Sequence, residues 1–284
     1  MDIIPVRSLA DLIARCSDEK CGCGHVVYRG VSDVNNHHLI PSVGRVPRYS
    51  HDPDYPIQVH ERELLTTFKL RSAGSLHVVP KNDWEWLALA QHHGLPTRLL
   101  DWTFSPLIGA YFSTLPKLDA AGELREPEAD TAGLYALHDC SYITVEDHPD
   151  PLSVEKPGLF FPPHVSPRIS GQGGLFSIQP NPTEELQVSF ETCEYRWIRL
   201  FTFSREVAQE IQRTLYVLGI RQSLLFPDLD GFATEIRMRD TLADCYVSDH
   251  CFDAMRAAEP DAAPNGGPAT PAGKSRVQEG GRHR

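Results

Sequence analysis

The sequence has no apolar run close to the roughly twenty residues that a membrane-spanning helix needs. Its first residues, Met-Asp-Ile-Ile-Pro, also lack the basic stretch and apolar run of a secretory signal. Basic residues are in the minority, with 27 lysines and arginines against 38 acidic residues and a formal net charge of −11. A surface of that sign repels phosphate backbones and anionic lipids. We therefore expect a cytoplasmic protein that binds neither membranes nor, non-specifically, nucleic acid.

Cysteines are few and odd in number. The seven scattered over 284 residues are typical of reduced thiols rather than of a disulfide framework. Cys21, Cys23 and His25, with Cys16 nearby, offer soft zinc ligands, but the Cys-x2-Cys knuckle of structural zinc sites is missing. The turn at 171–174 likewise lacks the Gly-Lys-Ser/Thr of a phosphate-binding P-loop. We expect a surface loop with free thiols and no metal.

The composition is that of a globular protein. Hydrophobic residues make up 41% and charged residues 23%, which excludes a collagen, a coiled coil or a wholly disordered chain. Residues 257–284 contain Val277 as their one large apolar residue and are predicted to be disordered. Residues 1–256 form the predicted domain, interrupted at 116–131 by an acidic stretch that predicts a solvated loop.

Helix and strand signals are mixed within this domain. Capping residues, glycine terminators and apolar stripes predict helices at residues 61–73, 83–93, 106–114 and 205–218. Alternating or β-branched runs predict strands at residues 26–30, 133–138 and 195–203. Because helices and strands interleave without a regular rhythm, we expect an α+β fold with a central mixed or antiparallel sheet flanked by helices.

Polar residues concentrate at 97–103, between two apolar helices. This segment carries two hydroxyls, Thr97 and Thr103, together with an arginine, a carboxylate and an indole. We expect it to be a rigid linker, and for Arg98 and Asp101 we favour a pair that closes the loop by hydrogen bonds. The segment also suits ligand recognition, in which Arg98 binds phosphate oxygens and Trp102 stacks on a flat ring, and the two interpretations are compatible.

Tyr28-Arg29-Gly30, followed by LALAQHHGLPTRLLDWTFSPLIGAYFS at residues 87–113, resembles the FRG-domain family, which is named for a Phe-Arg-Gly motif. Tyrosine stands here in place of the phenylalanine. Residues 168–176 and 225–231 are also similar to the family, so the resemblance spans about residues 25–238. The motif order is similar to that of the ADP-ribosyltransferase superfamily, which implies an ADP-ribosyltransferase-like fold and NAD as substrate or ligand.

The resemblance also implies roles for individual residues. Arg29, with Tyr28 and Gly30, matches the motif that anchors NAD. The second element of the superfamily falls near residues 97–103 and Ser105.

The third motif of the superfamily supplies a glutamate, and Gln172 is its best match here. Glutamine can hydrogen-bond a ribose hydroxyl but brings no negative charge. Asp101 is a candidate for the missing carboxylate, and Glu235 is a more distant one. His92, at a helix end, either complements the helix dipole or acts as a general base.

Cleavage of the bond between nicotinamide and ribose passes through a cationic state, so such a site must fix the pyrophosphate and stabilise positive charge. The resemblance thus implies an NAD-dependent ADP-ribosyltransferase or NAD glycohydrolase, with a protein, a nucleic acid, a small molecule or water as acceptor. The alternative is a non-catalytic module that recognises a nucleotide or a partner, as a sensor in stress or phage defence. In a third interpretation, Arg29 and Arg98 only satisfy buried carboxylates.

Overall fold

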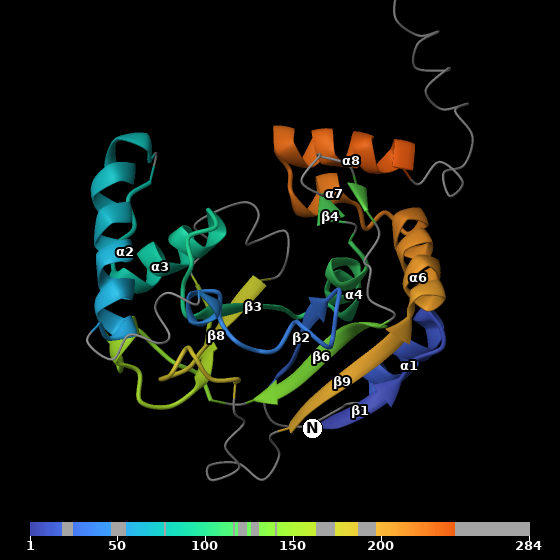
Figure 1. Cartoon of the computed structure of the whole chain (residues 1–284), viewed down its shortest axis with the longest axis horizontal. Coiled ribbons are helices and arrows are strands. Elements are labelled where there is room, and N and C mark those ends of the chain that lie inside the picture. Colours follow the sequence, from blue (N-terminus) through green and yellow to red (C-terminus); the bar gives the residue numbers. More distant parts are fainter. Residues whose placement is uncertain are drawn as a thin grey trace, which may run out of the picture. The chain divides into compact units, whose positions relative to one another are not determined.

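The computed structural model describes residues 1–18, 25–46, 55–76, 78–115, 117–118, 124–125, 131–139, 141–162, 174–186 and 197–241. Met1–Ala243 form one compact unit. In the described part of that unit, seven strands build one mixed sheet in the order β1-β9-β6-β2-β3-β8-β7 (Figure 1). The β1–β9 pair is parallel and the other neighbours are antiparallel.

The strands of this sheet are β1 Asp2–Pro5, β2 His25–Val31, β3 Leu99–Thr103, β6 Thr131–Asp139, β7 Gly158–Phe160, β8 Gly174–Ile178 and β9 Trp197–Ser204. The helices are α1 Leu9–Asp18, α2 Ile57–Ser72, α3 Asp83–His92, α4 Pro106–Thr114, α6 Arg205–Val217, α7 Gln222–Leu225 and α8 Leu229–Thr241. Short 3₁₀ turns are η1 Val43–Arg45, η2 Ala73–Ser75 and η3 Pro151–Ser153. Two-residue strands, β4 Lys117–Leu118 and β5 Leu124–Arg125, form a separate antiparallel pair within the predicted loop.

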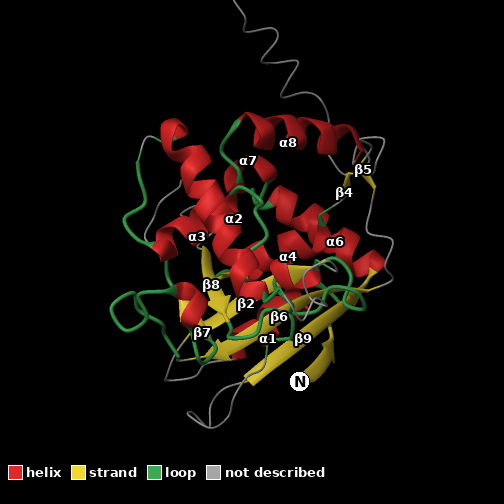
Figure 2. Ribbon diagram, turned by 60° about the vertical axis from the view of Figure 1, so that its left-hand side comes forward, coloured by secondary structure: helices red, strands yellow, loops and turns green. Residues whose placement is uncertain are grey.

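The helices form two groups over one face of the sheet (Figures 1 and 2). Each group packs in a hydrophobic core of its own. The α4 core joins α1, α4 and α6 to β2, β6 and β9. The α3 core joins α2 and α3 to β3, β7 and β8. Tyr28 of the α4 core stands opposite Thr103, and Leu99 of the α3 core alternates onto the same face as Thr103. The two cores therefore lie side by side on the same face.

The opposite face carries a third core that runs across the whole sheet. Its members come from six of the seven strands and from flanking loops, and include Val27, Leu100, Trp102, Tyr135, Leu175 and Leu200. The hydrophobic core is thus continuous on this face of the sheet and divided in two on the other face.

The division falls between β2 and β3. Within these two described strands one residue pair, Tyr28 with Thr103, stays in register. Beyond it β2 continues alongside β6 as far as Val31, and β3 continues alongside β8 back to Leu99. The two strands consequently diverge into a V that opens toward Arg29 and Asp101, which we call the notch.

Most sequence-predicted elements are confirmed. Asn82 caps α3 by accepting from the backbone N–H of Glu85, and Ser105 caps α4 by accepting from Ile108. Positive φ angles at Gly94 and Gly219 follow the ends of α3 and α6, as expected for glycine terminators. The α+β fold with one mixed sheet flanked by helices is also confirmed.

One element was predicted wrongly. Residues 97–103 are not a linker loop, because Leu99–Thr103 form β3 inside the sheet. The five-residue run reads Leu-Leu-Asp-Trp-Thr, whose single charge breaks the hydrophobic pattern of a buried strand. Its Asp101 is tolerated because it faces the open notch.

Candidate functional site

A cavity of about 360 Å³ lies at the notch, a volume within the range of small-molecule sites, roughly 300–1,000 Å³. We call it the notch pocket. Its lining residues come from β2, the end of α3, β3, α4 and the residue after α7: Tyr28, Arg29, Gly30, Gln91, His92, Asp101, Trp102, Thr103, Gly109, Phe112 and Phe226. Seven of these were candidate site residues from the sequence, so the fold brings most of the predicted set together.

Arg29 spans the diverging strands. Its Nη1 donates to the backbone oxygen of Asp101 at 2.8 Å and lies 3.4 Å from that residue's Oδ2. This carbonyl faces the side of β3 where β2 has moved away, so the guanidinium replaces a missing strand partner. The Nε of Arg29 is buried and makes no hydrogen bond to any residue that the structure describes. A buried donor without an acceptor is costly, so the site favours an additional acceptor.

Gln91 also donates hydrogen bonds to β3, to Asp101 and to the backbone two residues before it. Its Nε2 donates to the carboxylate of Asp101 at 3.0 Å and, at 3.5 Å, to the backbone oxygen of Leu99. Its Oε1 accepts from the Thr97 hydroxyl at 2.6 Å, and Ser42 bonds the backbone of Thr97. The Asp101 carboxylate is therefore held between Arg29 and Gln91, although its side chain remains 59% exposed.

Two aromatic rings line the pocket on the α4 side. Phe112 and Phe226 meet edge to face with ring centroids 6.1 Å apart. Tyr111 ties α4 to α7 through a 2.6 Å bond from its hydroxyl to Gln222, and Gly231 packs against the backbone of Phe226. The wall is thus fixed by α4, α7 and the start of α8, and it offers an apolar surface to a flat ring.

Packing alone requires a glycine at position 30, whether or not a ligand binds. A Cβ added there would lie 2.0 Å from the backbone oxygen of Gly109 and 2.6 Å from the amide of Ser113. At Gly109 an added Cβ would in turn meet Leu134 and Tyr28. The two glycines let α4 rest directly on β2, which sets the width of the notch pocket.

A comparison with protein-family models finds the FRG domain, matched over residues 24–121. This segment is an FRG domain. All lining residues of the notch pocket except Phe226 lie inside the match. No curated protein and no solved structure matches the chain.

The two arginines of the FRG domain occupy different environments. Arg98 does not pair with Asp101, as one interpretation of the sequence had it. Its side chain is fully buried, and its Nε and Nη2 bond the two carboxylate oxygens of Glu61 on α2. Backbone oxygens of Leu152 and Pro180 accept from Nη1. With its donors directed into the interior, Arg98 cross-links α2, β3 and two loops instead of facing the pocket.

Four other predicted site residues also have internal partners. Trp102 is 3% exposed and donates from Nε1 to Ser177 at 2.8 Å, so its indole presents no stacking face and that expectation is corrected. Thr97 is buried behind Gln91. Ser105 caps α4, and the Thr103 hydroxyl accepts from the Ser105 amide at 3.2 Å.

His92 is the last residue of α3 and lines the notch pocket. Its ring meets that of His93 edge to face, with centroids 5.0 Å apart. Glu235 is not a lining residue, and its carboxylate accepts from the amide of Ser223. Gln172 lies outside the described residues.

The predicted thiol loop is described only in part. Cys21 and Cys23 lie outside the described residues, as do the tail at 257–284 and most of 116–131. Cys16 is a free thiol on α1. Among the described residues there is no group of three or more potential metal ligands, and no helix there is long and apolar enough to cross a bilayer.

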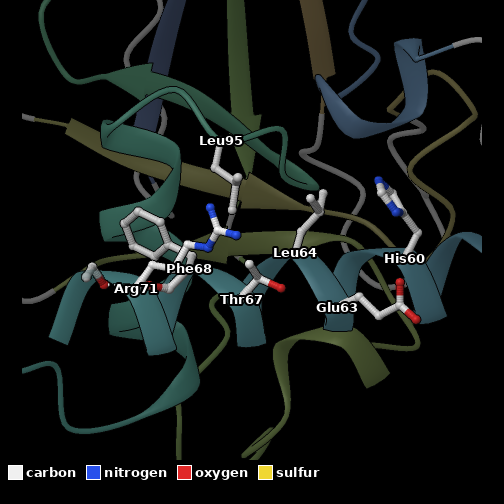
Figure 3. A pocket seen from close by; sticks show the side chains of 8 residues that line it. His60, Glu63, Leu64, Thr67, Phe68, Arg71 and Leu95 are labelled. Carbon is white, nitrogen blue, oxygen red and sulfur yellow. Dashed lines mark hydrogen bonds between the residues drawn. The ribbon is translucent and has the colours of Figure 1, made fainter.

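A second cavity, of about 440 Å³, runs along α2. We call it the α2 groove. Figure 3 shows its side chains in a row along the helix, with Leu95 facing them: His60, Glu63, Leu64, Thr67, Phe68 and Arg71. None of the sequence-predicted site residues lines it.

Four lining residues of the notch pocket were not predicted from the sequence: Gln91, Gly109, Phe112 and Phe226. The first three fall in the 87–113 motif, where Gln91 is the one amide side chain of α3. That amide directly follows the apolar run at residues 86–90, which was the available signal. Phe226 comes from a segment more than a hundred residues away, and no local pattern ties it to β2.

Proposed function

We propose that this FRG domain binds NAD or a closely related nucleotide in the notch pocket. The observation that carries the proposal is Arg29, which lines a cavity with an aromatic wall and whose buried Nε has no acceptor among the described residues. A guanidinium suits phosphate oxygens, and Phe112 with Phe226 suits a flat ring. A nucleotide combines both chemistries in one molecule.

The shape of the sheet supports an ADP-ribosyltransferase-like arrangement. An elongated ligand can enter where two strands diverge, because backbone groups at the edges of β2 and β3 are not engaged with each other beyond Tyr28 and Thr103. In the proposed reaction the bond between nicotinamide N1 and ribose C1′ breaks, and nicotinamide leaves as a neutral molecule. The acceptor forms a new bond to C1′ and loses a proton to solvent or to a nearby base.

Asp101 is the group in the described pocket best suited to this chemistry. Its carboxylate faces the cavity, and Gln91 and Arg29 hold it in place. A fixed negative charge stabilises the cationic ribose that develops as nicotinamide departs. His92 lies in the same lining and is the candidate base for the acceptor proton.

A second candidate function rests on the same geometry. Asp101 is the sole carboxylate among the described lining residues, and it is already bonded to Arg29 and Gln91. A carboxylate so engaged has less charge to offer a reacting centre. This favours a non-catalytic module that recognises a nucleotide and reports on it, as in a stress or phage-defence sensor.

The test is NAD turnover by the purified chain, with free nicotinamide as the readout and binding followed by calorimetry. Arg29→Ala removes the proposed phosphate ligand, Asp101→Asn removes the charge while keeping the shape, and Gln172→Ala tests the third motif. Arg71→Ala in the α2 groove is a matched control, because it deletes an exposed arginine of a cavity outside the proposal.

We expect Arg29→Ala to abolish NAD binding while lowering the melting temperature by no more than about 4 °C, with Arg71→Ala like wild type. Nicotinamide release that is lost in Asp101→Asn identifies the enzyme. Saturable binding without release identifies the sensor. Absence of both binding and release in wild type contradicts the proposal.

A further inference from the structure

Helix α8 presents its large apolar side chains to solvent. Leu229, Phe232 and Ile236 are spaced three and four residues apart, which places them on one face of the helix. Their exposed fractions are 84%, 48% and 65%. Both views of the chain show α8 at the margin of its compact unit, outside α7 and α4 (Figures 1 and 2). We call this row of three residues the α8 stripe.

The opposite face of α8 is fixed to the rest of the unit. Gly231 packs so closely against the backbone of Phe226 that a Cβ would not fit. The carboxylate of Glu235 accepts from the amide of Ser223 at 2.7 Å, and Met238 is buried. These contacts decide which face turns inward, so a rotation of the helix cannot bury the stripe. A surface helix normally packs its large apolar side chains on the core, and a continuous exposed row of them marks an interaction surface.

The charges beside the α8 stripe complement each other across two copies of the helix. Asp230 and Arg237 are exposed and seven residues apart, so they lie along the same flank, with the acid near the start of α8 and the base near its end. When two copies of α8 lie antiparallel about a two-fold axis, Asp230 of each copy faces Arg237 of the other. A parallel pair would place like charges together. Glu235, the other charged side chain described on α8, belongs to the inner face.

We propose that a second copy of this chain covers the α8 stripe, with the two helices antiparallel about a two-fold axis near Ala233. Leu229 of one copy then packs against Ile236 of the other. Apolar burial supplies the affinity, and the two pairs of Asp230 with Arg237 set the orientation. Because one surface pairs with itself, the assembly closes as a dimer. This inference is independent of the proposed nucleotide site.

The size of the α8 stripe sets the strength expected of this dimer. The helix has 13 residues, which corresponds to a length of about 20 Å. A contact along one such helix lies at the low end of the interface size range, below the roughly 800 Å² per partner of a standard interface. We therefore expect a dissociation constant in the micromolar range and a dimer that forms as the concentration of the chain rises.

Sedimentation velocity of the full chain, from low micromolar to the highest soluble concentration, measures this equilibrium. Ile236→Lys places a charge inside the contact, where it would be desolvated without a partner. Leu70→Lys is the matched control, because it makes the same change at an exposed leucine of α2. We expect wild type and Leu70→Lys to dimerise, and Ile236→Lys to remain monomeric with the melting temperature of the control.

Charge reversal tests the antiparallel orientation. Asp230→Arg and Arg237→Asp each turn both pairs between the helices into like-charge pairs, so each should weaken the dimer by about tenfold or more. The double variant restores two pairs of opposite charge and should recover the wild-type dissociation constant. In a parallel pair each position faces its own copy, so either single reversal would leave the repulsion between like charges unchanged.

Three results would overturn the dimer. They are a wild-type chain that stays monomeric up to its solubility limit, a dimer that survives Ile236→Lys, and an equal loss of the dimer in Leu70→Lys. The first of these would assign the stripe to a partner of another chemistry. Single charge variants that dimerise like wild type, or a double variant that fails to recover, would overturn the antiparallel orientation. Binding of NAD tests the nucleotide site separately.

Discussion

Arg98 and Arg29 both bond to carboxylates beside β3, yet their surroundings differ sharply. Arg98 and its partner Glu61 are 0% and 2% exposed, and the backbone oxygens of Leu152 and Pro180 accept from its Nη1. Arg29 and its partner Asp101 are 21% and 59% exposed, and the buried Nε of Arg29 has no acceptor within the described residues. The same pair of chemical groups therefore closes a core in one place and lines an opening in the other.

The role of an arginine therefore depends more on its burial and on how many of its donors are bonded than on the sequence motif in which it lies. A buried ion pair in which each guanidinium nitrogen bonds inside the protein is closed to a ligand, and loss of one partner would leave an uncompensated buried charge. A half-buried ion pair where two strands diverge can exchange its hydrogen-bond partners for ligand atoms with little loss of folding stability. The predictions below test that contrast.

Arg98→Ala has the largest expected effect on stability. It leaves the carboxylate of Glu61 buried without its partner, which costs about 3–5 kcal/mol of unfolding free energy. Chemical denaturation measures the loss. The double variant Arg98→Met with Glu61→Leu is the control, because an apolar pair of similar size should restore most of the stability. A loss below about 1 kcal/mol would place this pair among surface ion pairs and remove the contrast.

Gly30→Ala comes next, since its Cβ would collide with backbone atoms of α4. Shifting a packed helix typically costs about 1–3 kcal/mol, and it would also narrow the notch pocket. Thermal unfolding of this variant can be compared with that of Gly74→Ala, where nothing lies within 4 Å of the added carbon. We expect no loss at Gly74. Equal melting temperatures for both variants would refute the close approach of α4.

Arg29→Ala should cost about 1 kcal/mol or less, because water can take over the carbonyl of Asp101 in an open pocket. The measurement is denaturation in parallel with Arg98→Ala, under the same conditions. A collapse of the fold in Arg29→Ala would make both arginines structural. It would favour the interpretation in which each merely satisfies a carboxylate.

Cys16 provides the smallest expected signal, an absence of reaction. Burial raises the pKa of its thiol to about 11, while a hydrogen bond with Tyr28 opposes the shift. At pH 8 the reactive thiolate is therefore about 100-fold scarcer than for a thiol with the ordinary value of 9.0. Alkylation followed by peptide mass mapping should label Cys16 slowly in the native chain and fast in denaturant. Fast native labelling at pH 8 would show that this side of Tyr28 is open to solvent.

Much of the fold could be predicted from local signals. Asn82, Ser105 and Ser204 act as caps where the sequence places them, because capping depends on residues three positions apart. Gly94 and Gly219 adopt the positive φ that ends their helices. The motif at 87–113 was also enough to identify the family. These features need no knowledge of distant contacts.

The site was predicted only in part, and the errors have one cause. Arg98, Trp102 and Asp101 lie within five residues of one another, and the sequence treats them as one polar group. Strand alternation sends Trp102 to the opposite-face core and Asp101 to the notch, while Arg98 turns inward to Glu61. Local sequence could not reveal this, because it required knowing that residues 99–103 form a strand.

The sequence by itself determined the helix ends, the strand-forming runs, the acidic balance and the FRG family, since each depends on neighbouring residues or on composition. Only the tertiary structure decided which polar side chains share a cavity. The notch exists because β2 follows β6 while β3 follows β8, so residues 28–30, 91–92 and 101–103 meet where two strands part. Phe226 joins them through its ring contact with Phe112, which spans a long stretch of chain. This arrangement depends on distance and burial in the folded state, and no local pattern encodes it.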